Sequence, residues 1–350
     1  MAASGTKKPR RVMLILEILI LIGLLVVPLV TSDFHTIIAT RMLLLAILAI
    51  SFDLCWGYSG IMTFGQALFF GVAGYVAALL ANKAGYVQIW GIVPICMLVG
   101  LVSSFLIGWF LLLGKRTPTI IFVALGTLTA SYAAERLVAG WQWVGAGNGM
   151  SVWDFMKVGS YELEPGPVFY YVILGFLIVA YIASRWMVRS QLGLVLAGMR
   201  QNEERLAFFG YRVQRFKALV FSFSGMIAGL SGGLYAFHEG FIGPGSMGIG
   251  LSTYAVLYGL FGGVGTLLGP ILGVGAIETI AFILSDIDAL KPYWPVILGV
   301  IMLIVVAYRP TGIMGLIVTD RERIGSFGYR GGGEPDAGGK DAKEDTDGTA

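Results

Sequence analysis

Three acidic residues stand inside long apolar runs, where charged side chains are rare. Glu17, Asp53 and Glu278 each have mainly hydrophobic neighbours along the chain. A charge at the centre of a bilayer costs roughly 2.5–3.5 kcal/mol, so such residues usually face protein or water. Asp53 precedes residues 56–60 (WGYSG), whose glycines and polar groups predict a break in a helix. We expect this stretch either to line a solute pathway or to form a buried hydrogen-bond network.

Histidine and cysteine, the usual residues of metal sites, are scarce. The chain has 2 histidines, His35 and His238, and 2 cysteines, Cys55 and Cys96. The histidines stand alone and the cysteines lie in apolar runs, which predicts inert core thiols and no metal site. Ser/His/Asp, paired-carboxylate and HExxH arrangements are also missing from the sequence. It therefore predicts no enzyme active site and no cofactor.

The chain has no complete nucleotide-binding loop. The nearest approach to a phosphate loop is Gly114-Lys115-Arg116, where Trp109 stands in place of the first glycine and Arg116 in place of the hydroxyl residue. Residues 263–268 (GVGTLL) lack the last glycine of a dinucleotide loop. We expect this chain not to hydrolyse ATP itself.

The elements that must position these residues are membrane helices. Of 350 residues, 57% are hydrophobic and 13% are charged, whereas soluble domains carry about 25% charged residues. The mean hydropathy is +0.80. These values exclude a soluble enzyme and a wholly disordered chain. The formal net charge of +3 gives little support for nucleic-acid binding.

Ten apolar segments are expected to cross the bilayer, most of them near the roughly 20 residues that a span needs. They are 12–30, 37–56, 62–81, 89–113, 119–138, 167–185, 217–237, 251–264, 266–284 and 293–308. The first is longer than a signal-peptide core and reads as a retained helix. The segment 251–264 is short and runs into glycines, so a broken or re-entrant helix is the alternative, with nine crossings.

The distribution of basic residues predicts the orientation. With ten spans and a cytoplasmic N-terminus, 19 of the 24 lysine and arginine residues lie on the inner side. This is the bias that the positive-inside rule requires, and a shift of one span would remove it. Both termini are therefore predicted to be cytoplasmic.

Two long connections and the tail stand out from the spans. The connection 139–166 is predicted to lie outside, with tryptophans at the membrane interface. The connection 186–216 is predicted to lie inside and to form one or two short amphipathic helices that end at Gly210. Residues 319–350 are rich in glycine and charge, which predicts a disordered cytoplasmic tail beyond a membrane domain of 1–318.

Glycines recur at intervals of four. One set is Gly225, Gly229 and Gly233; others are Gly265, Gly269 and Gly273, and Gly259 and Gly263. In lipid, small residues let helix backbones approach closely, so tight helix packing is expected. Glycines also permit broken helices that line a pathway, and Pro270 supports a local break.

Four separated motifs resemble the branched-chain amino acid ABC permeases of the LivM type. They are DLCWGYSGIMTFGQALFFGVAGYVAALL at 53–80, RSQLGLVLAGMRQNEERLAFFGYRVQRFKALVFSFSGMIAGLSGGLYA at 189–236, LFGGVGTLLGPILGVGAIE at 260–278 and YRPTGIMGL at 308–316. Together they cover most of the chain up to about residue 318. Thr63 and Gln66 depart from the usual serine and histidine, and other positions lean toward the urea and short-amide branch of the family.

The resemblance implies an all-α polytopic permease fold and a role in an ATP-driven ABC importer. A second permease subunit would complete the pathway, ATPase subunits would bind the inner face, and a periplasmic or lipid-anchored binding protein would deliver the substrate. The substrate would be a branched-chain or hydrophobic amino acid, or alternatively urea or a short amide. The location would be the bacterial inner membrane. An ion-coupled secondary transporter is the less favoured alternative.

Two sets of residues are the candidates for these roles. For the translocation pathway they are Asp53, Gly57, Tyr58, Gly60 and Gln66. For coupling to the ATPase, within 186–216, they are Gly193, Asn202, Glu203, Arg205 and Gly210. A short amphipathic helix there would dock into a groove on each ATPase and turn nucleotide-driven closure into helix movement.

Overall fold

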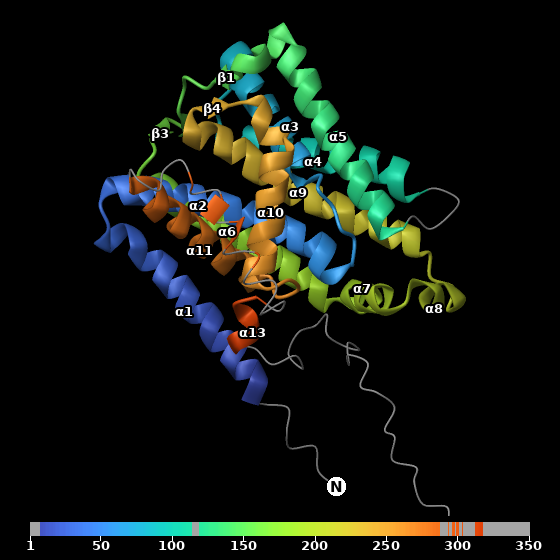
Figure 1. Cartoon of the computed structure of the whole chain (residues 1–350). Helices are drawn as coiled ribbons and strands as arrows, with labels where there is room; N and C mark the ends of the chain where they lie inside the picture. The colour runs from blue at the N-terminus through green and yellow to red at the C-terminus, as the bar shows by residue number, and fades with distance from the viewer. Residues whose placement is uncertain are drawn as a thin grey trace, which may run out of the picture.

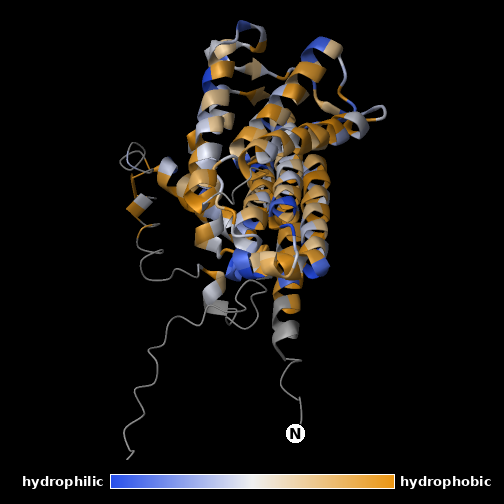
Figure 2. Cartoon of the chain, turned by 90° about the vertical axis from the view of Figure 1, so that its right-hand side faces the viewer, coloured by the Kyte–Doolittle hydropathy of each residue, from blue (hydrophilic) through white to orange (hydrophobic). Residues whose placement is uncertain are grey.

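The chain folds into a bundle of apolar helices (Figure 1). The computed structural model describes residues 8–113, 119–287, 293, 296–297, 299–300, 303 and 312–317. Within these residues, seven helices are long and apolar enough to cross a membrane. They are α2 (Asp33–Asp53) with its continuation η1 (Leu54–Tyr58), α3 (Gln66–Ala84), α4 (Ile89–Leu112), α5 (Ile120–Gly140), α6 (Pro167–Arg189), α9 (Val213–Glu239) and α11 (Leu268–Asp286). Hydrophobic residues predominate along these helices (Figure 2).

Two further helices match predicted segments. Helix α1 (Lys8–Val30) is apolar from Leu14 onward, and α10 (Ile249–Gly262) is short, as the glycines at its end led us to expect. The last predicted segment, 293–308, lies largely outside the described residues, as does the tail 319–350. A polytopic helical membrane protein is therefore confirmed, whereas ten crossings and cytoplasmic termini remain predictions.

Helices α2 and α9 form the core of the bundle. The second half of α2, from Leu43 to Asp53, is buried without interruption, and most of α9 is buried as well. Helix α2 packs against α6, α9, α10 and α11, and α9 packs against α3 and α4. A helix that is hydrophobic on all sides is one that neighbours surround, which matches the near-continuous apolar sequence of α2.

Small residues set the distance between α9 and its neighbours. A Cβ atom at Gly100 of α4 would lie 2.3 Å from the Gly225 carbonyl oxygen, and one at Gly229 would lie 2.5 Å from the Cys96 carbonyl oxygen. A Cβ atom at Gly232 would lie 1.9 Å from the Phe70 carbonyl oxygen of α3. The predicted glycine-mediated packing of α9 is thus confirmed.

The two long connections lie at opposite ends of the bundle (Figure 1). At one end are the short helices η2 (Gln142–Val144), η3 (Ala146–Asn148) and η4 (Pro244–Met247), with two small antiparallel ribbons. Strand β1 (Met150–Ser151) pairs with β4 (Phe241–Ile242), and β2 (Met156–Val158) pairs with β3 (Tyr161–Leu163). At the other end are the short helices α7 (Gln191–Gln201) and α8 (Glu203–Phe208), and α13 (Met314–Ile317) follows near the end of the described chain.

One predicted boundary was wrong, and one predicted break is confirmed. The helix expected from residue 62 begins at Gln66, because residues 59–65 continue the interruption that starts at Leu54. The local break that Pro270 supports is present, because residues 263–267 interrupt the chain between α10 and α11. Pro270 itself lies in the first turn of α11, where a missing backbone N–H leaves no helical bond unmade.

Glu17 anchors α1 to α6. Its carboxylate forms an ion pair with Arg185 and accepts a hydrogen bond of 3.0 Å from the Tyr181 hydroxyl. The Tyr170 hydroxyl donates to the Leu24 carbonyl oxygen at 2.7 Å. This intramembrane charge is therefore paired within the protein.

We predict that Gly229→Ala destabilises the bundle, whereas Gly175→Ala does not. The new methyl group at 229 would meet the α4 backbone, and overpacking of this kind costs about 1–3 kcal/mol. Gly175, on α6, has nothing within 4 Å of an added Cβ. Thermal unfolding in detergent micelles measures both variants. Equal melting temperatures would contradict the proposed close contact.

Candidate functional site

The membrane helix formed by α2 and η1 changes character near one end of the bundle. It is α-helical to Asp53, continues as the π-helical turn η1, and then gives way to the non-helical residues 59–65. Short π-helical turns inside longer helices frequently mark functional sites. The predicted break after Asp53 is present.

Asp53 joins this break to a second one. Its buried carboxylate accepts hydrogen bonds from the backbone N–H groups of Gly265, at 2.6 Å, and Leu267, at 3.0 Å. Both donors lie in the turn 263–267 between α10 and α11. Amides that precede a helix have no carbonyl partner within it, so a carboxylate satisfies them well. In this conformation Asp53 therefore holds two interrupted helices together.

Arg200 of α7 reaches the same junction. Its Nη1 atom donates to the Gly57 carbonyl oxygen at 2.6 Å. A Cβ atom at Gly57 would lie 2.6 Å from the Gly265 nitrogen, so only glycine permits this approach. Gly60 has a φ of +73°, and an added Cβ there would pack on the Arg200 side chain at 3.6 Å. The break in α2, the turn before α11 and the helix α7 thus meet at one point.

Gln66 lies elsewhere, in a buried polar network among α2, α3 and α9. Its Nε2 atom donates to the Ser224 hydroxyl at 2.9 Å, and its Oε1 atom accepts from the Ser51 hydroxyl at 3.1 Å. Tyr58 is also buried. Of the five pathway candidates only Gly60 is partly exposed, so in this conformation the other four have little contact with solvent.

Three of the five coupling candidates shape the connection between α6 and α9. Gly193 packs so tightly that a Cβ atom would lie 1.6 Å from the Val188 carbonyl oxygen. The Asn202 side chain caps α8 by accepting from the Arg205 backbone N–H at 2.9 Å. Gly210 ends the connection with a φ of +86°. One or two short helices ending at Gly210 were predicted, and the structure has two, α7 and α8.

The other two candidates carry charge. Glu203 forms an ion pair of 2.5 Å with Lys217 of α9, whose side chain is only 6% exposed. Arg205 is exposed on α8. Glu203 therefore ties α8 to the bundle, and Arg205 faces outward.

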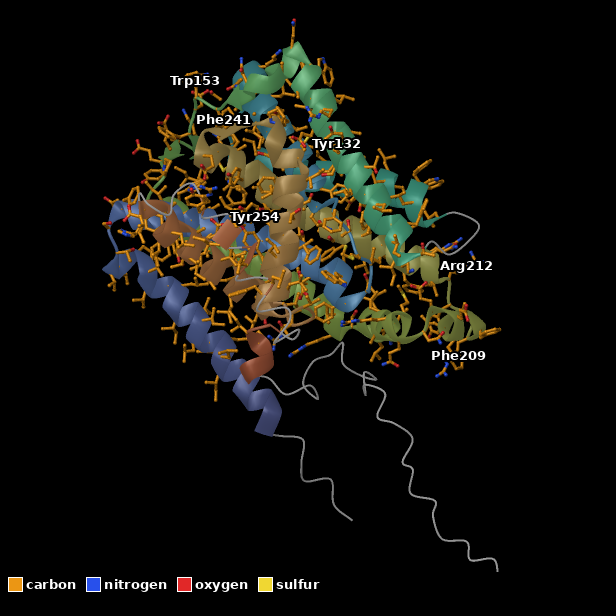
Figure 3. All side chains as sticks on the ribbon, in the orientation of Figure 1. Tyr132, Trp153, Phe209, Arg212, Phe241 and Tyr254 are labelled. Atoms are coloured by element: carbon orange, nitrogen blue, oxygen red, sulfur yellow. The ribbon has the colours of Figure 1, made fainter. Side chains whose placement is uncertain are left out.

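Sequence reasoning missed two features of this connection. Arg200 directly follows the buried Met199 and therefore lies at the edge of the apolar face of α7. This position in the sequence could have predicted that the Arg200 side chain contacts the bundle. Phe208 and Phe209 are 90% and 79% exposed at the end of α8, and Phe209 is labelled there in Figure 3. A pair of exposed phenylalanines beside charged residues is typical of a surface that another protein covers.

Nearer the opposite end, charged groups from α2, α9 and α11 lie close together. Arg41 Nε lies 3.8 Å from Glu239 Oε1, and the guanidinium also interacts electrostatically with Glu278. The Tyr258 hydroxyl of α10 donates to Glu278. This group of residues (Arg41, Glu239, Glu278 and Tyr258) is called the charged cluster below.

The described residues hold no group of three or more histidine, cysteine, aspartate or glutamate side chains that could bind a metal ion. Cys55 and Cys96 are buried free thiols. The arrangement offers hydrogen bonds and charges that position helices.

We predict that Asp53→Asn destabilises the protein by about 1.5–3 kcal/mol, because it weakens two charge-assisted hydrogen bonds to backbone donors. Asp286→Asn, at the exposed end of α11, is the control and should stay within about 0.5 kcal/mol of the wild type. Thermal unfolding in micelles measures the difference. Equal effects of the two substitutions would refute the role of Asp53 as a joint.

Comparison with known proteins agrees with this architecture. The chain is 25% identical over 324 residues to the high-affinity branched-chain amino acid transport permease LivM of Salmonella typhimurium and of Escherichia coli, covering 85% of this chain and 74% of each relative. It is 28% identical over 221 residues to the autoinducer 2 import permease LsrC of Yersinia pseudotuberculosis, covering 60% of this chain and 56% of that protein. No solved structure gives a significant match. The family model described as branched-chain amino acid transport system / permease component matches residues 35–306, so the chain belongs to this family of membrane permeases.

Proposed function

We propose that this chain is the transmembrane permease subunit of an ATP-driven importer for branched-chain and other hydrophobic amino acids. In this proposal it forms the translocation pathway with a second permease subunit in the bacterial inner membrane. The observation that carries the proposal is the contact of α7 with the broken end of α2 through Arg200. This hydrogen bond links the connection between α6 and α9 directly to a membrane-spanning helix of the bundle.

The connection from α7 to α8 has the properties of a docking element for an ATPase. It lies at one end of the bundle, where Figure 3 labels Phe209, and both Phe208 and Phe209 are exposed. Aromatic residues of this kind supply much of the affinity of protein interfaces. ATPase subunits would bind here and a substrate-binding protein at the opposite end. A movement of α7 would then pull on Gly57 and on the turn held by Asp53.

The orientation proposed from the sequence fits this assignment. The predicted cytoplasmic end is the end that carries α7 and α8, and the segment 185–217 alone holds seven lysine and arginine residues. Ten crossings with both termini in the cytoplasm would put this end on the side where ATP is available. The pathway residues would be Asp53, Gly57, Tyr58, Gly60 and Gln66, opened from their largely buried arrangement by this movement.

An amino acid is favoured as the substrate over urea or a short amide. The LivM relatives transport branched-chain amino acids according to their names. The charged cluster also supplies both signs of charge within a largely apolar bundle, Arg41 on one side and Glu239 and Glu278 on the other. A zwitterion carries both complementary charges, whereas urea carries none. A permease for urea or short amides stays the alternative.

Reconstitution tests the proposal. Proteoliposomes that contain this chain, its second permease subunit, the ATPase subunits and the binding protein should accumulate leucine when ATP is supplied. Uptake should persist when the proton gradient is collapsed. Uptake that follows the ion gradient and needs no ATP would favour a secondary transporter, and preferential uptake of urea would favour the alternative substrate.

We predict that the double substitution Phe208→Ala and Phe209→Ala releases the ATPase subunits. Removing two anchors that each contribute about 1–2 kcal/mol should lower the affinity by tenfold or more. Co-purification from membranes measures the loss. Trp153→Ala, an exposed aromatic at the opposite end, should leave co-purification unchanged. Retention of the ATPase by the double variant would contradict the docking assignment.

We predict that Arg200→Gln separates assembly from transport. Because the Arg200 guanidinium is bound to the Gly57 carbonyl oxygen, the ATPase subunits should still co-purify, while the loss of a charge-assisted hydrogen bond should lower leucine uptake by about tenfold or more. Arg205→Gln, on the exposed side of α8, is the comparison and should act on assembly first. Normal uptake by Arg200→Gln would show that α7 is not coupled through Gly57.

A further inference from the structure

A groove runs between α4 and α9 at the end of the bundle that carries α7 and α8. Its volume is about 720 Å³ and its lining is mainly apolar. One wall consists of Leu101, Phe105 and Trp109 of α4 with Leu113 just beyond it, and the other includes Leu219 and Arg215 of α9. Phe105, Trp109 and Leu219 are exposed among the described residues.

The close approach of the two helices explains why the groove exists. Backbone atoms of α4 and α9 meet at Gly100, Gly225 and Gly229. Large side chains cannot fit along this line of contact, so they stand beside it and form walls. Leu101, Phe105 and Trp109 are spaced four apart and therefore lie on one side of α4.

The length of the groove matches one leaflet of a bilayer. The stretch from Leu101 to Leu113 has 13 residues, and the 12 steps between its ends correspond to roughly 18 Å at the rise of an α-helix. One leaflet of a bilayer contributes about 15 Å of hydrocarbon. A fatty acyl chain that lies along the α4 wall would therefore span the groove from Leu101 to Leu113. Its headgroup would then lie at the Leu113 end of the groove.

Among the lining residues that the structure describes, the one with a charged side chain is Arg215, and it lies at that end. Arg215 is exposed, and its side chain has no ion pair or hydrogen bond within the part of the chain that the structure describes. Lys217, two residues on, is instead buried and paired with Glu203. Trp109 is 62% exposed on the opposite wall, as is typical of tryptophan at the level of lipid headgroups.

We propose that this groove binds one anionic glycerophospholipid, with an acyl chain along the α4 wall and the headgroup phosphate on Arg215. A guanidinium binds phosphate through two parallel hydrogen bonds, and basic pockets between helices on the cytoplasmic side select anionic headgroups. An unpaired arginine also disfavours the ammonium group of phosphatidylethanolamine. The site is separate from the junction at Asp53 and does not depend on the transported substrate.

The test uses the purified full-length chain and two probe lipids, phosphatidylglycerol and phosphatidylethanolamine. Native mass spectrometry from mixed micelles should show phosphatidylglycerol retained about tenfold better than phosphatidylethanolamine, the difference expected from charge-assisted hydrogen bonds. Arg215→Gln should abolish this preference. Arg212→Gln is the matched control, because this exposed arginine, labelled in Figure 3, lies three residues away and does not line the groove.

A second variant tests the apolar wall while the charge is kept. Leu219→Trp should fill the groove and lower phosphatidylglycerol retention, with Arg215 unchanged. Size-exclusion elution confirms that each variant is folded. Equal retention of the two lipids, or equal effects of Arg215→Gln and Arg212→Gln, would overturn the proposal. So would a disulfide between two copies of Leu219→Cys in membranes, because a second copy of the chain would then occupy the groove.

Discussion

A buried carboxylate in a bundle that lies in lipid can persist only where donors surround it, and Asp53 meets this requirement with backbone amides. The amides of Gly265 and Leu267 come from the turn before α11, where they lack helical partners. The Asp53 carboxylate at the end of α2 therefore finds its donors in backbone amides that precede α11, and each interrupted helix supplies the hydrogen-bond partner of the other. Because Arg200 binds the next turn of the same break, the interruption in α2, the start of α11 and the peripheral helix α7 form one mechanical unit.

Close packing through small residues is the second constraint. Lipid provides no hydrophobic force between apolar helices, so van der Waals contact and a few hydrogen bonds must hold them together. Helix α9 meets α3 and α4 through glycines, and the Gln66 network with Ser51 and Ser224 adds polar contacts at the same level. This core leaves large side chains on its margins, and these form the groove beside Arg215.

In the connection between α6 and α9, different residues determine its shape, attach it to the bundle and form its exposed tip. Gly193, Asn202 and Gly210 determine its shape, and the ion pair of Glu203 with Lys217 fastens it to α9. Phe208 and Phe209 are left exposed at its tip. A rigid element that is tied to the bundle and carries apolar side chains outward is suited to transmit force between subunits. This arrangement fits a permease whose energy comes from a partner.

The membrane class, the family and most of the described helices could be predicted from the amino-acid sequence alone, because hydropathy over about 20 residues and short motifs are local properties. The sequence also located the break after Asp53 and the connection at 186–216. It did not reveal that Asp53 binds the turn at Gly265 or that Arg200 reaches Gly57, since these contacts join residues more than 140 positions apart. Only the packing of α2, α7, α10 and α11 decided them. Exposure of Phe208 and Phe209 was likewise undecided, because an apolar residue on a short helix is buried or exposed according to what covers it.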